Sequence, residues 1–537
     1  MKLLPKPSTL NDKHLKVPPK PRFKPKFKKS MDSPPKSKHK VLLFNPRATN
    51  YKARIPNSVL QVAASIDATH EWVIVDGNLE DHPQEKIMAY FKTGEFKFFG
   101  CTVMPGPQLR QAVPITKAIR QAFPEIINIW GGYFPANHPE VVLESGWVDF
   151  IINGPGDHAF PQLLDALEQE TSFAGIQSLI YFDGMEVVKT AKAPLLRYDD
   201  LPSLPYDKLD KLYPMKRYLG KSFMGRHTIA YHSSFGCPFK CSFCAVVPIY
   251  EARWNGKSAD KIYADIKYMK EKYGADAIEF HDNNFFVSEK RTVAFSKLIK
   301  DENMQWWGEA RIDTVDKYSD ESLALMREAG CRMIFFGAES GNDDLLDFMD
   351  KGGKQTGQQI LDFAKRIQQF DIIPEYSFVL GWPAASEQEA LRQVEAEIDF
   401  IRKVKDANPQ TEIIIYVYSP VPTEGSEMFE KVKEQGFSFP QKLEDWLAPA
   451  WESFDLRKNP LTPWLTPRVI DKIRNFETVL NAYYPTVSDI KLSKFQRLSI
   501  SSIASLRYKL GMYGYPYELK ALQRFWLKYR QPEKEGF

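Results

Sequence analysis

Short apolar segments that end in turn-forming residues alternate with helical patterns along much of this 537-residue chain. This alternation predicts parallel strands joined by helices, because a parallel pair of strands needs a long crossover connection. In the first half we expect a five-stranded open α/β domain, Rossmann-like in its winding, with its ligand site beyond the carboxyl ends of the strands. Those ends are expected at Asn45-Pro46, at Asp76-Gly77, near Gly106, at Gly131-Gly132 and at residues 154–157.

The alternation resumes at about residue 226 with six further strand candidates, which predict an incomplete (β/α)6 barrel. After about residue 430 amphipathic helical patterns predict a helical C-terminal region. Between the two α/β parts, an apolar hairpin and repeated prolines indicate a connector. The predicted units are a disordered Lys/Pro-rich tail at 1–40, the first domain at 41–170, the connector at 171–215, the barrel at 216–430 and the helical region at 431–537.

Composition excludes several classes of protein. No run of about 18 apolar residues occurs, so we expect no integral membrane segment. The net charge of +4 comes largely from the first forty residues, which gives little support to nucleic-acid binding. The five cysteines do not form the spaced pairs of a secreted disulfide framework, so a cytoplasmic protein is predicted. The tail is interpreted as a solvated segment or as a docking arm for an acidic partner or an anionic lipid surface.

Three of the five cysteines lie in one short stretch with the spacing Cys-x3-Cys-x2-Cys, at Cys237, Cys241 and Cys244. Thiolates bind soft metal centres, and three of them would leave one iron of a [4Fe–4S] cluster open to another ligand. Structural zinc normally takes four ligands, and the remaining cysteines, Cys101 and Cys331, lie in apolar strand patterns. A [4Fe–4S] cluster is favoured over zinc with an outside ligand and over three unrelated thiols.

The stretch "SFGCPFKCSFC" resembles the cluster-binding motif of the radical S-adenosylmethionine (radical SAM) enzymes, although Phe235 stands in place of the usual Arg. Downstream stretches such as "IEFHDNNFF" and "MIFFGAESGNDD" are similar to those of the subgroup with an N-terminal cobalamin-binding domain. In the first half, "WGGYFPANHPE" and "DFIINGPGDHAF" resemble that subgroup's Gly-Gly-x-His-Pro and Gly-Glu-Gly-Glu motifs, with Pro155 and Asp157 departing from the commonest residues.

The resemblance implies that the three cysteines bind a [4Fe–4S] cluster and that SAM chelates its fourth iron. An electron from a donor such as flavodoxin or ferredoxin then produces a 5′-deoxyadenosyl radical. The resemblance places Phe243 against the adenine, Asp282 and Asn283 at the amino group, Arg311 opposite the carboxylate, and Glu339 at the ribose or amino group. Polar residues also commonly cap strand ends and helix starts, and that alternative stays open. His281 is expected to be a packing residue.

The resemblance also implies cobalamin in the first domain. Its expected contacts are Thr102, Met104, Gly106, Gly131, Gly132, Tyr133 and Phe134 at strand ends, with Gly154 and Gly156 near the nucleotide tail. No Asp-x-His-x-x-Gly stretch occurs, so no histidine of that motif reaches the lower face of cobalt. A first domain that binds nothing is the alternative.

The leading functional hypothesis is methylation of an unactivated carbon of a small metabolite through the radical and methylated cobalamin. The same cofactors also suit cyclisation, ring contraction or oxidation, and a non-catalytic cluster or cobalamin sensor is a further alternative. A methylthiotransferase needs three more cysteines upstream, whereas only Cys101 precedes Cys237. No residue is assigned a catalytic role in the chemistry on the substrate.

Overall fold

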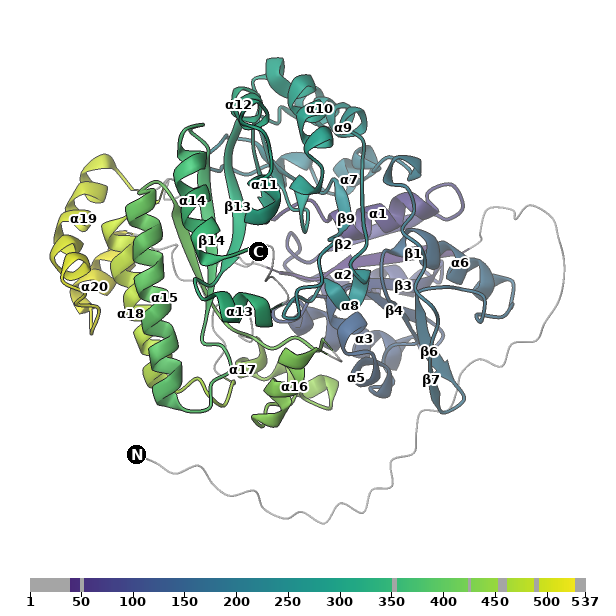
Figure 1. Ribbon diagram of the computed structural model, residues 1–537. Helices are drawn as coiled ribbons and strands as arrows, with labels where there is room; N and C mark the ends of the chain where they lie inside the picture. The colour runs from purple at the N-terminus through teal and green to yellow at the C-terminus, as the bar shows by residue number, and fades with distance from the viewer. Residues whose placement is uncertain are drawn as a thin grey trace, which may run out of the picture.

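The computed structural model describes residues 39–48, 53–349, 355–423, 426–452, 461–486 and 492–526. The predicted disordered tail, apart from its last two residues, lies outside the described residues. Figure 1 shows a first α/β unit in purple and blue, a second in teal and green, and outlying helices in yellow.

The first sheet has the order β2-β1-β3-β4-β5-β6-β7. Its first five strands are parallel and are β1 (Lys40–Asn45), β2 (Trp72–Asp76), β3 (Phe96–Thr102), β4 (Ile127–Gly131) and β5 (Phe150–Ile152). Their near-continuous apolar sequences suit strands that are covered on both faces. Val41 and Leu43 pack under one set of helices, and Leu42 and Phe44 under the other. The doubly wound arrangement confirms the predicted fold class of this part.

Six helices cover this sheet: α1 (Asn57–Ile66), α2 (Pro83–Lys92), α3 (Leu109–Ala122), α4 (Tyr133–Asn137), α5 (Pro139–Glu144) and α6 (Gly156–Glu168). Helices α1 and α6 share a core with Val41, whereas α2 and α3 share a core with Leu42. The short helix α4 starts immediately after β4, at the carboxyl edge of the sheet.

The hairpin that the sequence placed in the connector belongs to the first sheet, so the predicted number of five strands was too low. Strand β6 (Leu179–Asp183) pairs antiparallel with β5, and β7 (Glu186–Lys189) pairs antiparallel with β6. The rest of the connector holds η1 (Tyr198–Asp200), α7 (Tyr206–Leu212) and η2 (Met215–Arg217). It packs on β2, where the buried carboxylate of Asp76 accepts a hydrogen bond of 2.9 Å from Tyr218 Oη.

The second sheet is the predicted open barrel, with all six strands parallel in the order β15-β14-β13-β12-β11-β8. The strands are β8 (Thr228–Tyr231), β11 (Ala277–Phe280), β12 (Gln305–Ala310), β13 (Cys331–Glu339), β14 (Ile373–Leu380) and β15 (Glu412–Val417). A small antiparallel pair, β9 (Ser234–Gly236) and β10 (Trp254–Gly256), follows β8.

The helices of the barrel are α8 (Val247–Tyr250), α9 (Ala259–Tyr273), η3 (Phe285–Val287), α10 (Glu289–Ile299), η4 (Lys300–Glu302), α11 (Ile312–Val315), α12 (Asp320–Glu328), α13 (Asp343–Phe348), α14 (Gly357–Gln368) and α15 (Glu387–Ala407). Several of them start at a side chain that accepts a hydrogen bond from the first helical turn, including those of Ser258, Ser288, Ser319, Thr356 and Ser386. Such N-caps explain why these helices begin where they do.

The C-terminal region is helical, as predicted, with α16 (Glu427–Glu434), η5 (Leu443–Leu447), α17 (Pro449–Glu452), α18 (Pro467–Tyr483), α19 (Lys494–Lys509) and α20 (Tyr517–Trp526). Leu443 and Trp446 of η5 enter the core of the first unit beside α3. Helix α18 packs on α15, and α19 and α20 pack on α18. Within the described residues, no helix combines the length and the apolar character that crossing a membrane requires.

Candidate active site

The cysteine loop follows β9 at the carboxyl end of the barrel sheet. Cys241 is buried, and Cys237 and Cys244 are partly buried. Burial raises the pKa of the Cys237 thiol, and it raises the pKa of Cys244 to about 12. Ligation of a metal centre by these thiols would therefore release protons, because the thiolate is the ligand. Among the described residues, no three His, Cys, Asp or Glu side chains are placed to hold a single metal ion.

A buried polar network fixes the base of this loop. The Asp282 carboxylate, which is fully buried, accepts hydrogen bonds from the Ser233 amide at 2.9 Å and from the Ser233 and Ser234 hydroxyls. Burial raises the pKa of Asp282, and the Arg291 guanidinium and the serine donors oppose that rise. The structure thus places Asp282 beneath the loop, where its oxygens hold the segment that leads to Cys237.

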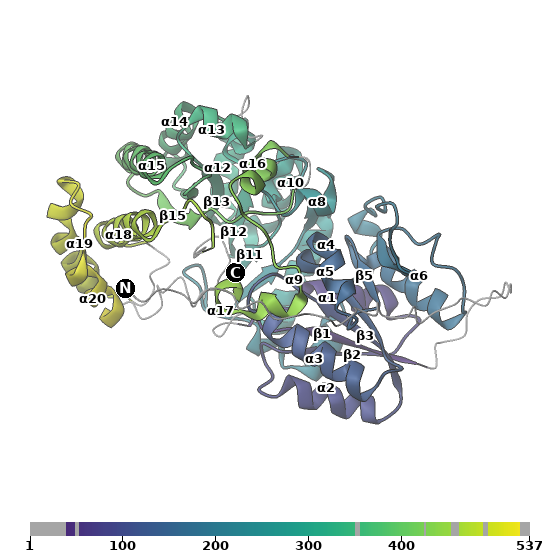
Figure 2. The same cartoon turned by 90° about the horizontal axis from the view of Figure 1, so that it is seen from below.

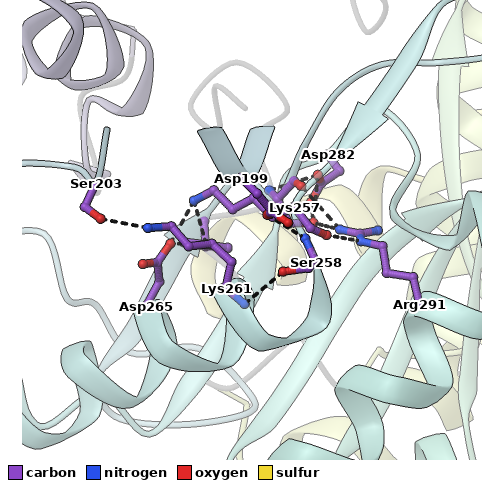
Figure 3. Close-up of polar contacts among 10 residues, drawn as sticks. Asp199, Ser203, Lys257, Ser258, Lys261, Asp265, Asp282 and Arg291 are labelled. Carbon is purple, nitrogen blue, oxygen red and sulfur yellow. Dashed lines mark hydrogen bonds and ion pairs between the residues drawn. The ribbon is translucent and has the colours of Figure 1, made fainter. Parts of the chain in front are cut away.

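Two basic residues complete the network (Figure 3). Arg291 donates to the Ser233 hydroxyl and, over 2.9 Å, to the carbonyl of Lys257. Lys257 forms an ion pair of 2.8 Å with Asp265 of α9. Buried charged side chains therefore join the base of the cysteine loop to α9 and α10. Removing one of these side chains would leave its partner's charge buried and uncompensated.

Arg311, at the end of β12, contacts the cysteine loop directly. Its Nη1 donates to Cys241 Sγ at 3.2 Å, and its guanidinium lies 4.1 Å from the ring centroid of Phe239. Asp313 accepts from Nε at 2.8 Å and from Nη2 at 3.1 Å. This bidentate pair fixes the plane of the guanidinium and aims the remaining N–H groups at the sulfur.

Asn284 is a second buried donor beside the cysteines. Its side chain is 1% exposed, and neither its amide nitrogen nor its oxygen has a hydrogen-bond partner in the structure. Burial raises the pKa of the Cys237 thiol, and the Phe239 amide and Arg311 lower it; the Asn284 carboxamide lies near enough to lower it as well, although it makes no hydrogen bond of regular geometry. An orphaned amide next to a thiol suits an iron–sulfur cluster, whose sulfur atoms accept N–H hydrogen bonds. The residues present therefore fit a cluster held by this loop.

Phe243 and Glu339, two of the predicted SAM contacts, lie at the same end of the barrel. Phe243 packs edge-to-face on Trp382, with 5.8 Å between ring centroids. Glu339 ends β13 with a φ of +66°, a left-handed conformation that costs a non-glycine residue about 1–3 kcal/mol. Glu397 accepts hydrogen bonds from the next two residues, the Ser340 hydroxyl and the Gly341 amide, and so holds this strained strand end.

The carboxyl edge of the first sheet is shaped by glycines after β3 and β4. Gly132 has a φ of +98°, and a Cβ there would lie 2.8 Å from the carbonyl oxygen of Val103. A Cβ on Gly131 would meet its nearest neighbour, Ile152, at 3.9 Å, an ordinary van der Waals contact, so this position would accept a small side chain without a clash. With glycine there, the backbone of this edge stays accessible where the cobalamin contacts are predicted. The other predicted contacts on this edge are Thr102, the exposed Met104, Gly106, Gly154 and Gly156, whereas Phe134 lies in the core against Trp446.

The carboxyl edge of the first sheet meets the carboxyl edge of the barrel sheet at Tyr133 and Asn283. Asn283 Nδ2 donates to Tyr133 Oη at 3.3 Å, which joins the start of α4 to the end of β11. Burial, together with the nearby Cys244, Glu309 and Cys237, raises the pKa of Tyr133 to about 12, and the hydrogen bond with Asn283 opposes that rise. Tyr133 of the first unit therefore reaches the cysteine loop of the barrel.

A pocket of about 380 Å³ is lined by residues of both units. Its walls come from α4 and α5 of the first unit, from the cysteine loop and α8, and from the segment before α16, through residues such as Asn137, Asn153, Lys240, Ser242 and Thr423. The two units thus share a hollow next to the predicted cluster site.

Sequence reasoning missed a polar group on the inner face of the barrel. It consists of His232, Glu279, His281, Glu309 and Glu375, which lie on the strands β8, β11, β12 and β14 or at their ends. His281 Nε2 lies 3.3 Å from Glu279 Oε2, and Trp307 Nε1 donates to Glu375 Oε2 at 3.3 Å. The intervening residues Ile278, Phe280 and Trp306 pack in the core under the helices. The signal in the sequence was this alternation within "IEFH", "WWGEA" and "IPEYS".

Burial sets the protonation of this inner group. It raises the pKa of Glu309 to about 8 and lowers the pKa of His232 to about 3. At neutral pH the carboxyl of Glu309 is therefore largely protonated and the His232 ring is neutral. Arg54 of the first unit forms an ion pair of 3.4 Å with Glu279 of this inner group.

Comparison with known families agrees with this geometry. A model of the B12-binding domain matches residues 54–164, over the first sheet, and a model of the radical SAM superfamily matches residues 231–394, over the barrel. The chain is a radical SAM enzyme with a B12-binding domain. The resemblance drawn from the cysteine motif and the strand-end motifs is thereby confirmed.

Three known proteins illustrate the similarity. An uncharacterized methyltransferase from Pyrococcus horikoshii is 28% identical over 375 residues, which cover 68% of this chain and 78% of that protein. An anaerobic magnesium-protoporphyrin IX monomethyl ester cyclase from Synechocystis sp. is 24% identical over 278 residues, which cover 49% of this chain and 54% of that protein. OxsB, a cobalamin-dependent S-adenosylmethionine radical enzyme, has a TM-score of 0.68 at 14% identity over 91% of this chain and 75% of its own.

The family gives the cofactors. A radical SAM domain implies a [4Fe–4S] cluster and SAM, and a B12-binding domain implies cobalamin, which confirms the predicted cofactor set. The assignment of single residues to these cofactors stays a prediction.

Proposed function

We propose that this radical SAM enzyme transfers a methyl group to an unactivated carbon of a small metabolite. When bound, the cluster and SAM supply a 5′-deoxyadenosyl radical and cobalamin supplies the methyl group. The observation that carries the proposal is the meeting of the two carboxyl edges, where Tyr133 of the B12-binding domain accepts a hydrogen bond from Asn283 of the barrel. A substrate between the two edges would face both cofactors.

In this proposal Cys237, Cys241 and Cys244 hold the cluster. Asp282 keeps the loop in place through the serines before Cys237. Arg311 directs an N–H group at Cys241 Sγ over 3.2 Å. A fixed loop with donors already aimed at its sulfurs needs no rearrangement when the cluster binds.

SAM would lie beside the cluster, against Phe243, Asn283 and Glu339. Glu339 ends β13 with a strained, left-handed backbone, and such strain is typical of residues at ligand sites. Arg311 is already bonded to Asp313, so any contact of Arg311 with the SAM carboxylate would use its N–H groups on the side of Cys241. A small electron donor, such as flavodoxin or ferredoxin, would reduce the cluster.

Cobalamin would lie on the opposite edge, over the strand ends that carry Thr102, Met104 and Gly106, over Gly131 to Tyr133, and near Gly154 and Gly156. The glycine at 131 supports this position, because without a side chain its backbone can be approached closely by a ligand. Tyr133 would then lie between the bound cobalamin and the cysteine loop.

A second candidate is a carbon–carbon bond-forming cyclisation with the same cofactors. The observation in its favour is the 24% identity to an anaerobic magnesium-protoporphyrin IX monomethyl ester cyclase. In this reaction the radical would act on the substrate and no methyl group would be transferred.

Labelled SAM separates the two candidates. Anaerobically reconstituted enzyme is incubated with a reductant, S-adenosyl[methyl-d3]methionine and a pool of small metabolites. Methyl transfer predicts a product that carries three deuterium atoms, together with S-adenosylhomocysteine and 5′-deoxyadenosine. Cyclisation predicts 5′-deoxyadenosine without S-adenosylhomocysteine or label in the product, and that result would contradict the methyltransferase.

A further inference from the structure

Helices α19 (Lys494–Lys509) and α20 (Tyr517–Trp526) form the outer end of the molecule. Figures 1 and 2 show them in yellow, beyond α18 and away from both sheets. One side of this helix pair packs on α18, where Ile500, Ala504, Tyr508 and Leu519 are buried. The opposite side faces away from the rest of the protein.

That outward side is unusually apolar. Twelve large hydrophobic side chains are exposed among the described residues, and nine of them fall between residues 495 and 525. Phe495 and Phe525 are each 76% exposed. The outer apolar surface consists of Phe495, Leu498, Ile503, Leu506, Leu510, Met512, Tyr515, Tyr517 and Phe525. An exposed apolar patch of this kind marks a site of interaction with another protein or with a membrane.

The same stretch is cationic. Residues 493–526 contain six Lys or Arg side chains and a single carboxylate, which gives a formal charge of +5. The carboxylate, Glu518, is paired with Arg507. Lys494, Lys509 and Arg524 have no ion-pair partner within the described part of the chain. The partner of the outer apolar surface must therefore be apolar and anionic.

We propose that the outer apolar surface binds an anionic lipid bilayer and holds the enzyme at its face. Helices with a Phe- and Leu-rich side and basic residues lie in the boundary between headgroups and acyl chains, and basic residues near it are drawn to anionic lipids. The tyrosines Tyr515 and Tyr517 suit that boundary, because a tyrosine ring is apolar and its hydroxyl is polar, whereas Phe495 and Phe525 suit the acyl-chain side. With no helix able to span a membrane in the described residues, attachment would be peripheral.

A second copy of the chain is a less suitable occupant. A twofold dimer through this surface would bring two identical patches together, and with them two sets of Lys494, Lys509 and Arg524, which have no ion-pair partner in the described part of the chain. The lipid proposal stands apart from the methyltransferase proposal, because it rests on none of the residues of the candidate active site.

The test is co-sedimentation of the full-length protein with vesicles. Two compositions are compared, phosphatidylcholine alone and phosphatidylcholine with phosphatidylserine. The first variant is Leu506→Ser with Leu510→Ser, which removes apolar contact, and the second is Lys494→Ala with Lys509→Ala, which removes charge. The matched control is Met185→Ser, because Met185 is 73% exposed in the β6–β7 turn of the first unit. All these side chains are exposed or at the surface, so thermal unfolding is expected to be unchanged.

The proposal predicts that the protein binds the phosphatidylserine vesicles and that this binding weakens as the salt concentration rises. The partition coefficient should fall about tenfold for each leucine replaced and about 30-fold for the two lysines together, with no change for Met185→Ser. Absence of vesicle binding overturns the proposal. Binding that both leucine changes leave intact also overturns it, because the Lys-rich N-terminal residues would then account for the attraction. A dimer that the leucine changes dissociate, without vesicle binding, would assign the surface to a second copy instead.

Discussion

Replacing Gly132 with alanine would disturb the edge on which cobalamin is proposed to lie. Gly132 has φ +98° and ψ −176°, a region that is essentially restricted to glycine and costs other residues about 1–3 kcal/mol. The new Cβ would also lie 2.8 Å from the carbonyl oxygen of Val103. That oxygen accepts the Phe134 amide at 3.0 Å, and losing the bond costs about 1 kcal/mol more. The local free energy of opening should therefore fall by about 2–4 kcal/mol.

Hydrogen–deuterium exchange of peptides from β3, β4 and α4 measures this local opening. A loss of about 2 kcal/mol or more predicts amide exchange at least about 30-fold faster in Gly132→Ala. Gly131→Ala is the matched control, because its Cβ would meet Ile152 only at 3.9 Å and its φ is not positive. Equal exchange in Gly132→Ala, Gly131→Ala and the natural protein would refute the reasoning about this edge.

Three further predictions concern the candidate site. Gly131→Ala adds a methyl group to the edge proposed for cobalamin without a clash inside the protein, so it should weaken cobalamin binding in equilibrium dialysis while circular dichroism stays unchanged; unaltered affinity would place cobalamin elsewhere. Asn284→Leu removes the orphaned donor beside Cys237, so an EPR-monitored titration should show a cluster potential lower by about 40 mV for about 1 kcal/mol of hydrogen bond, and an unchanged potential would contradict a contact with the cluster. Burial raises the pKa of Glu309 from 4.5 to about 8, so the folded state keeps a proton that the unfolded state has lost, and stability should fall as pH rises from 4.5 to 8. Glu309→Gln should remove that fall in urea unfolding midpoints, and a parallel pH profile for both proteins would contradict the assignment.

The sequence was sufficient to predict the two α/β units, because their strands are buried on both faces and so appear as short apolar runs between turn residues. It also predicted the cysteine loop, since the spacing of Cys237, Cys241 and Cys244 is local. It could not show that β6 pairs with β5, because nothing within a hairpin specifies the edge to which it adds. The role of Asp282 was equally hidden, since its partners Ser233 and Ser234 lie 49 and 48 positions earlier in the chain.

The inner polar group of the barrel was missed for a related reason. For His281 the sequence indicated only a packing role. Only the pleat of the strands separates the inward side chains, such as Glu279 and Glu309, from the outward Phe280 and Trp306. Their convergence also needs the register of four strands, which no local pattern supplies.

The account rests on two cofactors that meet in one protein, and the most direct test is their stoichiometry. The chain is reconstituted anaerobically with iron, sulfide and hydroxocobalamin and then desalted. Bound cobalt, iron and the visible spectrum are measured before and after replacing Cys237, Cys241 and Cys244 with alanine. The account predicts stoichiometric cobalt in both proteins and an iron–sulfur band that only the cysteine-containing protein retains. A cysteine-dependent cluster without bound cobalt would contradict it, and the methyltransferase proposal would then fall.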